Sequence, residues 1–353
     1  MSKILRHSVG EPAPPSADSG LDARATALRD GRQSAAVRAR YRAMGFMTLS
    51  VALMFLLPLV VGASAYFWFL VIGVLLLSYS RFRGIEQGFP CVELCFIIPP
   101  SLSGYLFKLL PSARIPSVDE LLLKFDANFF YPEALAGKFF QIHPAIPLFF
   151  GVVYWGIPLA GVLLYLALPN RAAVRRKYIL TNAFTLLIFF FYRICPASGP
   201  RALIGTAFPN AIPNLAEAHA RIIPHVALNA VPSGHFTWAL IMFWFARRYC
   251  GNATKVAAGA FLLLTLIATL GKGEHYVIDL IVAAPFAAGV WALSGREWRL
   301  AIVSLSLTLL WCVALEKGWL LPVPRIAVWL LCTLTLAPFV PDPRVNLFSR
   351  APL

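Results

Sequence analysis

Long runs of hydrophobic residues, broken by short polar segments, occupy the chain from Phe46 onward. A membrane-spanning helix needs about 20 mainly apolar residues to cross a hydrocarbon core of about 30 Å, and about ten of the runs approach that length. Their predicted limits are 46–63, 65–80, 89–107, 146–168, 178–195, 235–250, 255–270, 275–294, 299–316 and 319–339. The pattern therefore predicts an all-α fold, a polytopic integral membrane helix bundle.

The composition supports this assignment and excludes an ordinary soluble domain. Hydrophobic residues make up 59% of the chain and charged residues 13%, with a mean hydropathy of +0.72. A soluble domain is about 45–50% apolar and about 25% charged, so the apolar excess must face lipid. Six cysteines lie in or beside apolar runs without metal-ligand spacing, and we interpret them as small buried hydrophobes: Cys91, Cys95, Cys195, Cys250, Cys312 and Cys332.

The basic residues are unevenly placed along this pattern. The chain carries 31 Lys and Arg against 16 Asp and Glu, a net charge of +15. Twenty-one of the 31 fall on one side of the predicted bundle, and the positive-inside rule makes that side cytoplasmic. Both termini are then cytoplasmic. The positive charge thus indicates membrane topology, and we expect no nucleic-acid partner.

The same pattern divides the chain into five segments. Residues 1–45 form a basic cytoplasmic tail that is predicted to be disordered, and residues 46–107 form the N-terminal membrane helices. An extracytoplasmic interfacial segment follows at 108–145 and a membrane core at 146–294. Residues 295–353 supply C-terminal membrane helices and a short tail.

A short helix is expected inside the interfacial segment. Ser117 and Glu120 have the spacing of a capping box, which marks a helix N-terminus. The apolar residues after it recur at helical spacing and predict one hydrophobic face: Leu121, Leu122, Phe125 and Phe129.

The first block with chemical character is Pro232-Ser233-Gly234-His235, where an outer loop becomes the span 235–250. Serine is a favoured N-cap, and the free amides of a helix N-terminus attract anions. A phosphate would fit there. Taken alone, the block is equally typical of an ordinary helix start.

The second block is Gly271-Lys272-Gly273-Glu274-His275-Tyr276-Val277-Ile278-Asp279. His275 and Asp279 are four residues apart, so on a helix the carboxylate can hold and polarise the imidazole. An oriented imidazole is a nucleophile or general base. His235 and His275 are 40 residues apart, which is one helix across the bilayer and one back. We therefore expect the two histidines to meet on the outer side.

Two arginines lie on that same side, Arg193 and Arg201, within Tyr192-Arg193-Ile194-Cys195-Pro196-Ala197-Ser198-Gly199-Pro200-Arg201. A guanidinium is a planar, permanently charged fork that suits phosphate oxygens. Either arginine could instead anchor a helix end at the lipid headgroups.

The ordered series of Arg, Pro-Ser-Gly-His and His-x-x-x-Asp resembles the type-2 phosphatidic acid phosphatase superfamily. The blocks cover about residues 192–285, and the resemblance implies a six-helix catalytic core within 146–294. It also implies that His275 attacks phosphorus to form a phosphohistidine, that Asp279 orients it, and that His235 protonates the leaving oxygen. The implied phosphate-binding residues are Arg201, Arg193, Lys272, Ser233 through its hydroxyl and Gly234 through its amide. No metal or other cofactor is implied.

The match departs from the superfamily's pattern in two blocks. The usual Lys before the first arginine is absent, and Gly-Pro-Arg stands in that place. The third block has Ala268-Thr269 where Ser-Arg is usual, so Lys272 is the candidate replacement cation. Gly-Pro-Arg and the stretch from Glu274 to Ala283 look more like the inositol phosphorylceramide synthase and sphingomyelin synthase branch.

Three functions follow as hypotheses. The first is a phosphoesterase acting on a phospholipid or other lipid phosphate at the extracytoplasmic face. The second is transfer of a phosphoryl head group, such as inositol phosphate, to a lipid alcohol such as ceramide or diacylglycerol. The third, from another class, is a transporter or lipid-binding scaffold whose ionisable residues line a pathway. The sequence names neither the head group nor the oligomeric state.

Overall fold

The computed structural model describes residues 65–82, 115–212, 219–220, 223 and 227–338. Its regular elements are all helices, so the predicted all-α class is confirmed. In chain order they are α2 (Ala65–Phe82), α4 (Asp119–Asp126), η1 (Ala127–Phe129), α5 (Pro132–Gln141), α6 (Ala145–Trp155), α7 (Ile157–Ala167), α8 (Ala172–Phe184), η2 (Thr185–Leu187), α9 (Ile188–Ile194), α10 (Pro200–Ile204), η3 (Gly205–Ala207), α11 (Gly234–Tyr249), α12 (Asn252–Gly271), α13 (Val277–Ser294), α14 (Trp298–Glu316) and α15 (Arg325–Leu336).

The long apolar helices match the predicted spans within the described residues. Four stretches are long and apolar enough to cross a membrane: α8 to α9 as one unit, α12, α13 and α14. The bent pair α6 and α7 makes a fifth if it is one span. Helix α11 has 16 residues, close to the predicted span 235–250. The predicted span 319–339 is too long, because α15 has only 12 residues and begins after Pro324. The predicted spans 46–63 and 89–107 lie outside the described residues, so the total of about ten spans stays a prediction.

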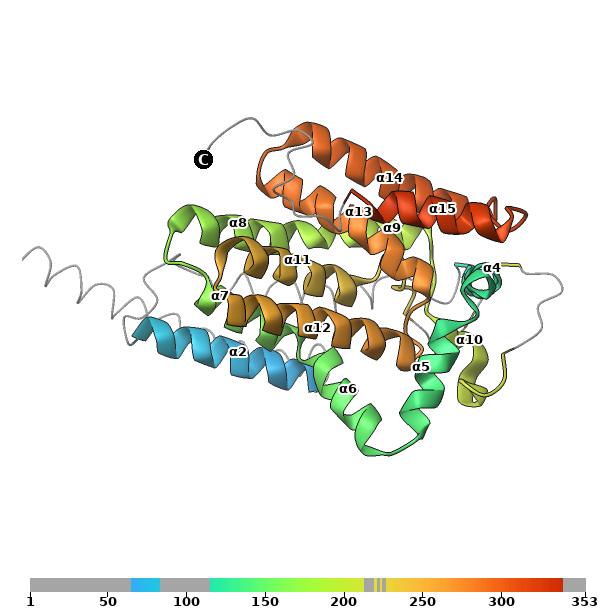
Figure 1. Cartoon of the computed structure of the whole chain (residues 1–353), viewed down its shortest axis with the longest axis horizontal. Helices are drawn as coiled ribbons and strands as arrows, with labels where there is room; N and C mark the ends of the chain where they lie inside the picture. Colours follow the sequence, from blue (N-terminus) through green and yellow to red (C-terminus); the bar gives the residue numbers. More distant parts are fainter. Residues whose placement is uncertain (1–64, 83–114, 213–218, 221–222, 224–226, 339–353) are drawn as a thin grey trace, which may run out of the picture.

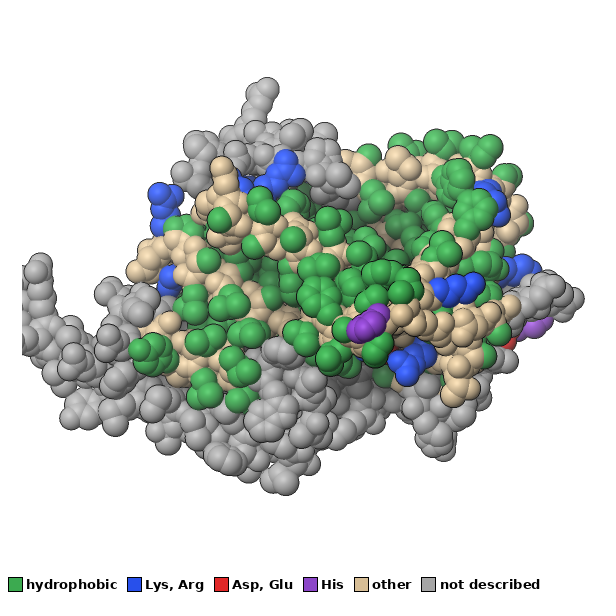
Figure 2. Space-filling model, turned by 60° about the horizontal axis from the view of Figure 1, so that its bottom comes forward, with side chains coloured by type: hydrophobic (Ala, Val, Ile, Leu, Met, Phe, Trp, Pro, Cys, Tyr) green, Lys and Arg blue, Asp and Glu red, His purple; other side chains and the backbone are tan. Residues whose placement is uncertain are grey.

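The core of the bundle is α13, which packs against α8, α11, α14 and α15 (Figure 1). Of the 18 residues of α13, 83% are buried, whereas only 22% of the most apolar 18 residues of α12 are buried. A helix that is apolar on every side belongs in the interior, and α13 meets that description. Hydrophobic side chains cover most of the described part of the face in Figure 2, with Lys and Arg mainly toward its two ends, as expected of a surface facing lipid.

The predicted span 146–168 is not one straight helix. α6 and α7 are bent by 55° at Gly156. Pro158 is in the first turn of α7 and has no amide hydrogen, so the carbonyl of Tyr154 loses its helical partner. The bend turns the end of α6, with Tyr154 and Trp155, toward α11.

The predicted capping box of the interfacial segment is wrong. The N-cap of α4 is Val118, without a side-chain cap. The Ser117 hydroxyl bonds instead to the Asp119 carboxylate, and the Glu120 carboxylate accepts from the backbone N–H of His219. The helix begins later than expected because these polar side chains bind other parts of the chain. The predicted apolar face is present, since Leu122 and Phe125 are buried.

The cysteine interpretation agrees with the structure where the residues are described. Cys195, Cys312 and Cys332 are buried with free thiols, and Cys250 is partly buried. Cys91 and Cys95 lie outside the described residues.

Candidate active site

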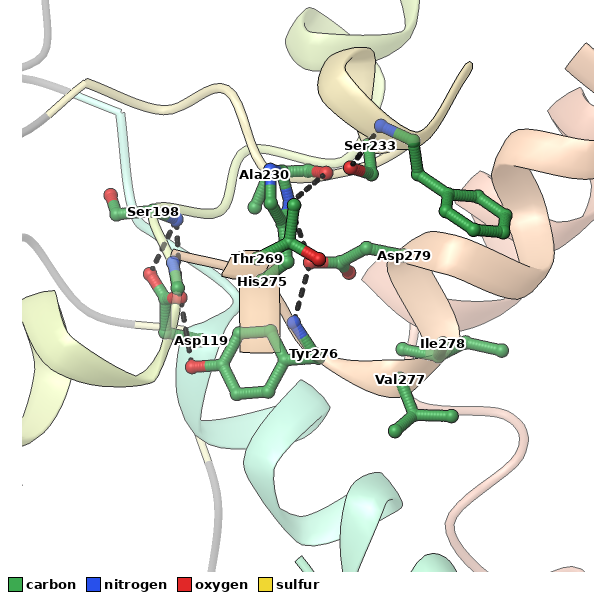
Figure 3. A network of polar contacts seen from close by, with 12 residues as sticks. Asp119, Ser198, Ala230, Ser233, Thr269, His275, Tyr276, Val277, Ile278 and Asp279 are labelled. Atoms are coloured by element: carbon green, nitrogen blue, oxygen red, sulfur yellow. Dashed lines mark hydrogen bonds and ion pairs between the residues drawn. The ribbon is translucent and has the colours of Figure 1, made fainter. Parts of the chain in front are cut away.

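His275 and Asp279 form the centre of the candidate site (Figure 3). Nδ1 of His275 lies 3.3 Å from Oδ2 of Asp279 and 3.1 Å from the carbonyl oxygen of Ala230. Both neighbours are acceptors, so we assign the proton to Nδ1. The Nε2 lone pair of His275 is then the nucleophilic one. The imidazole is buried, with 3% exposure.

The expected geometry of this pair needs one correction. α13 begins at Val277, so His275 precedes the helix and the two residues do not share a helix face. Asp279 is in the first turn and reaches back, where its carboxylate also accepts from the backbone N–H of Tyr276 at 2.8 Å. The same carboxylate therefore caps α13 and orients the imidazole.

His235 lies beside His275, as their spacing in the sequence predicts. The ring centroids are 6.2 Å apart. α11 begins at Gly234 and α13 at Val277, while α12 ends at Gly271, all at one end of the bundle (Figure 1). One helix across and one back thus return the chain to the same end.

An aromatic wall holds His235 in place. Its ring stacks on Tyr154 at 3.8 Å between centroids, and Trp155 and Trp238 meet it edge-on at 6.3 and 6.2 Å. Nε2 of His235 is buried and has no hydrogen-bond partner in the described part of the chain. Buried polar atoms are nearly always paired, so this nitrogen is suited to pair with a bound ligand.

The start of α11 bears out the N-cap interpretation of Ser233. Its hydroxyl oxygen accepts from the N–H of Phe236 at 3.3 Å. The Ser233 N–H in turn donates to the backbone carbonyl of Asp279 at 3.1 Å. The Pro-Ser-Gly-His block is thereby joined to the helix that carries the carboxylate, and Gly234 sits at the first helical position.

The Arg201 loop rests directly on the His275 loop. The backbone N–H of Arg201 donates to the carbonyl of Gly273 at 2.9 Å. Gly199 has φ +104°, and a Cβ there would collide with the backbone of Glu274. Glycine is needed at 199 both for its positive φ and for this close approach.

Lys272 directly follows α12 and lies next to the aromatic wall. Its Nζ lies 5.3 Å from the ring centroid of Tyr154 and 5.6 Å from that of Trp155. The pKa of Lys272 is lowered, mainly by burial. The charge of Arg201 lowers it further, and the charge of Glu274 partly opposes the shift. Lys272 therefore lies beside the aromatic residues that pack on His235, and the charge of Arg201 is close enough to act on it. Arg193 is exposed in the last turn of α9, and within the described residues it makes no hydrogen bond or ion pair with the other candidates.

Several residues of the site were not anticipated from the sequence. Tyr154 and Trp155 reach it through the bend at Gly156, for which Gly-Ile-Pro is the signal in the sequence. Asp119 and Asp126 of α4 reach it through long-range contacts that no local pattern indicates. Among the described residues, no three His, Cys, Asp or Glu side chains are grouped as a metal ion would require.

Three buried carboxyl groups outside the membrane spans have raised pKa values. Burial raises the pKa of Asp119 to about 6, although four hydrogen bonds oppose the shift. Burial and the charge of Glu133 raise the pKa of Asp126 well above its usual range. Burial, with a smaller contribution from the charge of Asp279, raises the pKa of Glu133 to about 7. Neither carboxylate oxygen of Glu133 has a hydrogen-bond partner in the described part of the chain.

Glu133→Gln is expected to stabilise the protein at alkaline pH. A raised folded-state pKa means that folded protein binds the proton more tightly, so stability falls as pH rises from 4.5 through about 7. The shift corresponds to a loss of about 3 kcal/mol at most. Thermal unfolding in detergent at pH 5 and pH 8 should show a smaller decline for Glu133→Gln than for wild type. Glu316→Gln, at a partly exposed ion pair, is the control, and equal declines in all three proteins would contradict the account.

By its fold and site, the chain is a helical membrane protein with two histidines, a carboxylate and two cations gathered at one end of the bundle. Residues 120–293 match the family model of the PAP2 superfamily, and this region of the chain belongs to that superfamily. The matched region runs from α4 to the last turn of α13 and contains every site residue that the sequence predicts. No curated protein and no solved structure matched the chain. Members of the superfamily are phosphatases and phosphotransferases.

Proposed function

We propose that this protein is an integral membrane phosphoesterase that cleaves a lipid phosphate through a phosphohistidine at His275. The observation that carries the proposal is the pair of acceptors on Nδ1 of His275, the Ala230 carbonyl and the Asp279 carboxylate. They keep the proton on Nδ1 and leave Nε2 unprotonated. A histidine held in this tautomer is a ready nucleophile.

The first chemical step forms a bond between Nε2 of His275 and phosphorus and breaks the bond between phosphorus and the leaving oxygen. His235 donates a proton to that oxygen, so the lipid leaves as an alcohol. The positive charge gained by the His275 ring is stabilised by the Asp279 carboxylate at 3.3 Å. Without that carboxylate the imidazole would be a poorer nucleophile and would lose its orientation.

The second step releases phosphate. His235, now neutral, takes a proton from water, and the oxygen of that water bonds to phosphorus as the bond to Nε2 of His275 breaks. Both histidines return to their starting states. The buried Nε2 of His235, which lacks a hydrogen-bond partner in the described chain, supports its role as the group that exchanges this proton.

The negative charge on the phosphoryl oxygens is neutralised by Arg201 and Lys272, with the Ser233 hydroxyl and the Gly234 amide as further donors. The backbone bond from Arg201 to Gly273 supports this assignment because it holds the Arg201 backbone against the loop that leads to the nucleophile. Both arginines are exposed, and Arg193 is the weaker candidate because only Arg201 is hydrogen-bonded to the His275 loop within the described residues. We place the site on the extracytoplasmic face, on the basis of the positive-inside rule.

Hydrolysis and head-group transfer share the first step and differ in what attacks the intermediate. The superfamily contains both phosphatases and phosphotransferases, and its chemistry disfavours a transporter or scaffold.

We expect purified protein to release inorganic phosphate from at least one donor among phosphatidic acid, polyprenyl diphosphate and a phosphoinositide. The assay is run with and without ceramide and diacylglycerol as acceptors. A phosphorylated acceptor as the sole product would contradict hydrolysis, and turnover that survives loss of both histidines would contradict the enzyme mechanism.

A further inference from the structure

We propose that α4 is a positioning element, in which the carboxylates of Asp119 and Asp126 hold the Arg201 loop and the His275 loop in register. This inference rests on the proposed function. It assigns a role to two residues that lie 75 or more positions from any proposed catalytic or phosphate-binding residue except Arg193. The hydrogen bonds of both aspartates go to backbone N–H groups and to the Ser117 and Tyr276 hydroxyls, so we assign neither aspartate a direct contact with the phosphate.

Asp119 joins the two loops through one carboxylate. Oδ1 accepts from the backbone N–H groups of Ser198 at 3.1 Å and Gly199 at 2.8 Å. These residues directly precede Pro200 and Arg201. The same oxygen accepts from the hydroxyl of Tyr276, the residue after His275, at 2.9 Å. Asp119 is therefore bonded to the segment beside the phosphate-binding arginine and to the segment beside the nucleophile (Figure 3).

Asp126 holds the N-terminus of α13. Its Oδ2 accepts from the N–H of Val277 at 2.6 Å, and its Oδ1 accepts from that of Ile278 at 3.4 Å. A helix N-terminus has unpaired N–H groups and a partial positive charge, so a carboxylate there is favourable. Because Asp279 belongs to the same first turn, Asp126 fixes the helix end from which the carboxylate reaches His275.

The rest of α4 is anchored firmly enough to act as a support. Leu122, Leu123 and Phe125 are at most 1% exposed, and Phe125 packs edge-on against Trp311 of α14 at 6.5 Å. The N–H of Val118 donates to the carbonyl of Pro196 at 2.9 Å. The helix is thus fixed to the bundle on its apolar side while its carboxylates face the two loops.

The complete burial of two polar carboxyl groups makes a purely structural role a poor explanation. Both aspartates are fully buried, and within the described residues neither forms an ion pair with Lys or Arg. Burying a carboxyl group without an ion pair is costly even when it is hydrogen-bonded, and apolar packing would often be as stable. What these carboxylates supply, and apolar side chains would not, is a defined position for backbone N–H groups and for the Tyr276 hydroxyl.

The test uses three variants in the full chain, each assayed with phosphatidic acid in detergent micelles or with whichever donor of the panel is turned over. Tyr276→Phe removes one oxygen atom and only the link from Asp119 to the His275 loop. We expect kcat to fall about tenfold with KM within twofold of wild type. Asp119→Asn disturbs both loops and is expected to lower kcat and raise KM, each about tenfold or more. Tyr178→Phe is the matched control, because its hydroxyl donates to the Gly161 carbonyl at 2.9 Å in another part of the bundle.

The outcomes separate this inference from the proposed function. His275→Ala is assayed in parallel, and if it retains turnover the proposed function fails. If His275→Ala is inactive while Tyr276→Phe matches wild type in kcat, the positioning role is overturned and the proposed function stands. An equal loss of kcat in Tyr178→Phe and Tyr276→Phe would also overturn it, because a general loss of packing would then explain both. Tyr276→Phe keeps the test decisive if Asp119→Asn does not fold.

Discussion

Replacing His275 with alanine is expected to abolish phosphate release from every donor that the wild-type protein turns over. The side chain supplies the atom that bonds to phosphorus, and in the described chain the other site histidine has its ring fixed by stacking on Tyr154 at 3.8 Å. A catalytic nucleophile has no substitute in the site, so the residual rate should be at or below about one part in 10⁴ of wild type. Phosphate release by purified protein in detergent is the measurement.

The matched control for this variant is His143→Ala. His143 is an exposed histidine that precedes α6 and accepts from the N–H of Ala145 at 3.1 Å. Its loss should leave turnover within twofold of wild type. Equal thermal unfolding midpoints for His275→Ala and wild type would show that the loss of activity is chemical. Substantial turnover by His275→Ala would contradict the assignment of the nucleophile.

Replacing His235 with alanine is expected to lower kcat by about 10²–10⁴-fold for a lipid phosphate with an alkyl leaving group. The physical reason is the unfavourable departure of an alkoxide when no acid protonates it. A leaving group that is already stable as an anion needs no proton, so a nitrophenyl phosphate should lose far less of its rate. The measurement is therefore the ratio of kcat for the two substrates in His235→Ala, compared with the same ratio in wild type.

Trp238→Phe is the control for the aromatic surroundings of His235. Trp238 meets the His235 ring edge-on at 6.2 Å and donates through Nε1 to the Thr185 hydroxyl at 3.0 Å. This variant disturbs packing without removing an acid, so both substrates should slow by a similar factor. If His235→Ala slowed the two substrates equally, His235 would be acting through position or packing and the general-acid role would be contradicted.

The convergence of the two histidines could be predicted because it depends only on the number of residues that two membrane crossings need. His235 and His275 are separated by two membrane-crossing lengths, and a helix that crosses must return to the same side. The contact between His275 and Asp279 was also predictable from their four-residue spacing. Its geometry was not, because the helix start lies between them and the carboxylate reaches back to cap it.

The role of α4 could not be predicted because its hydrogen bonds join residues that are far apart in the sequence. Asp119 bonds to Gly199 across 80 positions and to Tyr276 across 157. Hydrophobic periodicity located a helix there and its buried face correctly, but the spacing of Ser117 and Glu120 was misread as a cap. Periodicity reports which side of a helix is buried, and it carries no information on which distant backbone N–H groups a buried carboxylate meets.

The bend between α6 and α7 could not be predicted from hydropathy. The run 146–168 has the composition of one span, and hydropathy alone does not register that Pro158 removes a helical hydrogen bond. The bend brings Tyr154 against His235 and under Lys272. The aromatic wall of the site thus depends on a break that a span-by-span reading treats as continuous.

The most direct test of the central claim is to trap the phosphorylated protein. Wild type, His275→Ala and Tyr178→Phe are mixed with donor labelled in its phosphate, quenched in alkali within the first turnover, and digested for mapping by mass spectrometry. A phosphohistidine is stable in alkali and labile in acid, unlike a phosphoserine. The proposed mechanism predicts an acid-labile label on the peptide that contains His275, in wild type and Tyr178→Phe only. Turnover without such a label, or a label mapped to another residue, would contradict it.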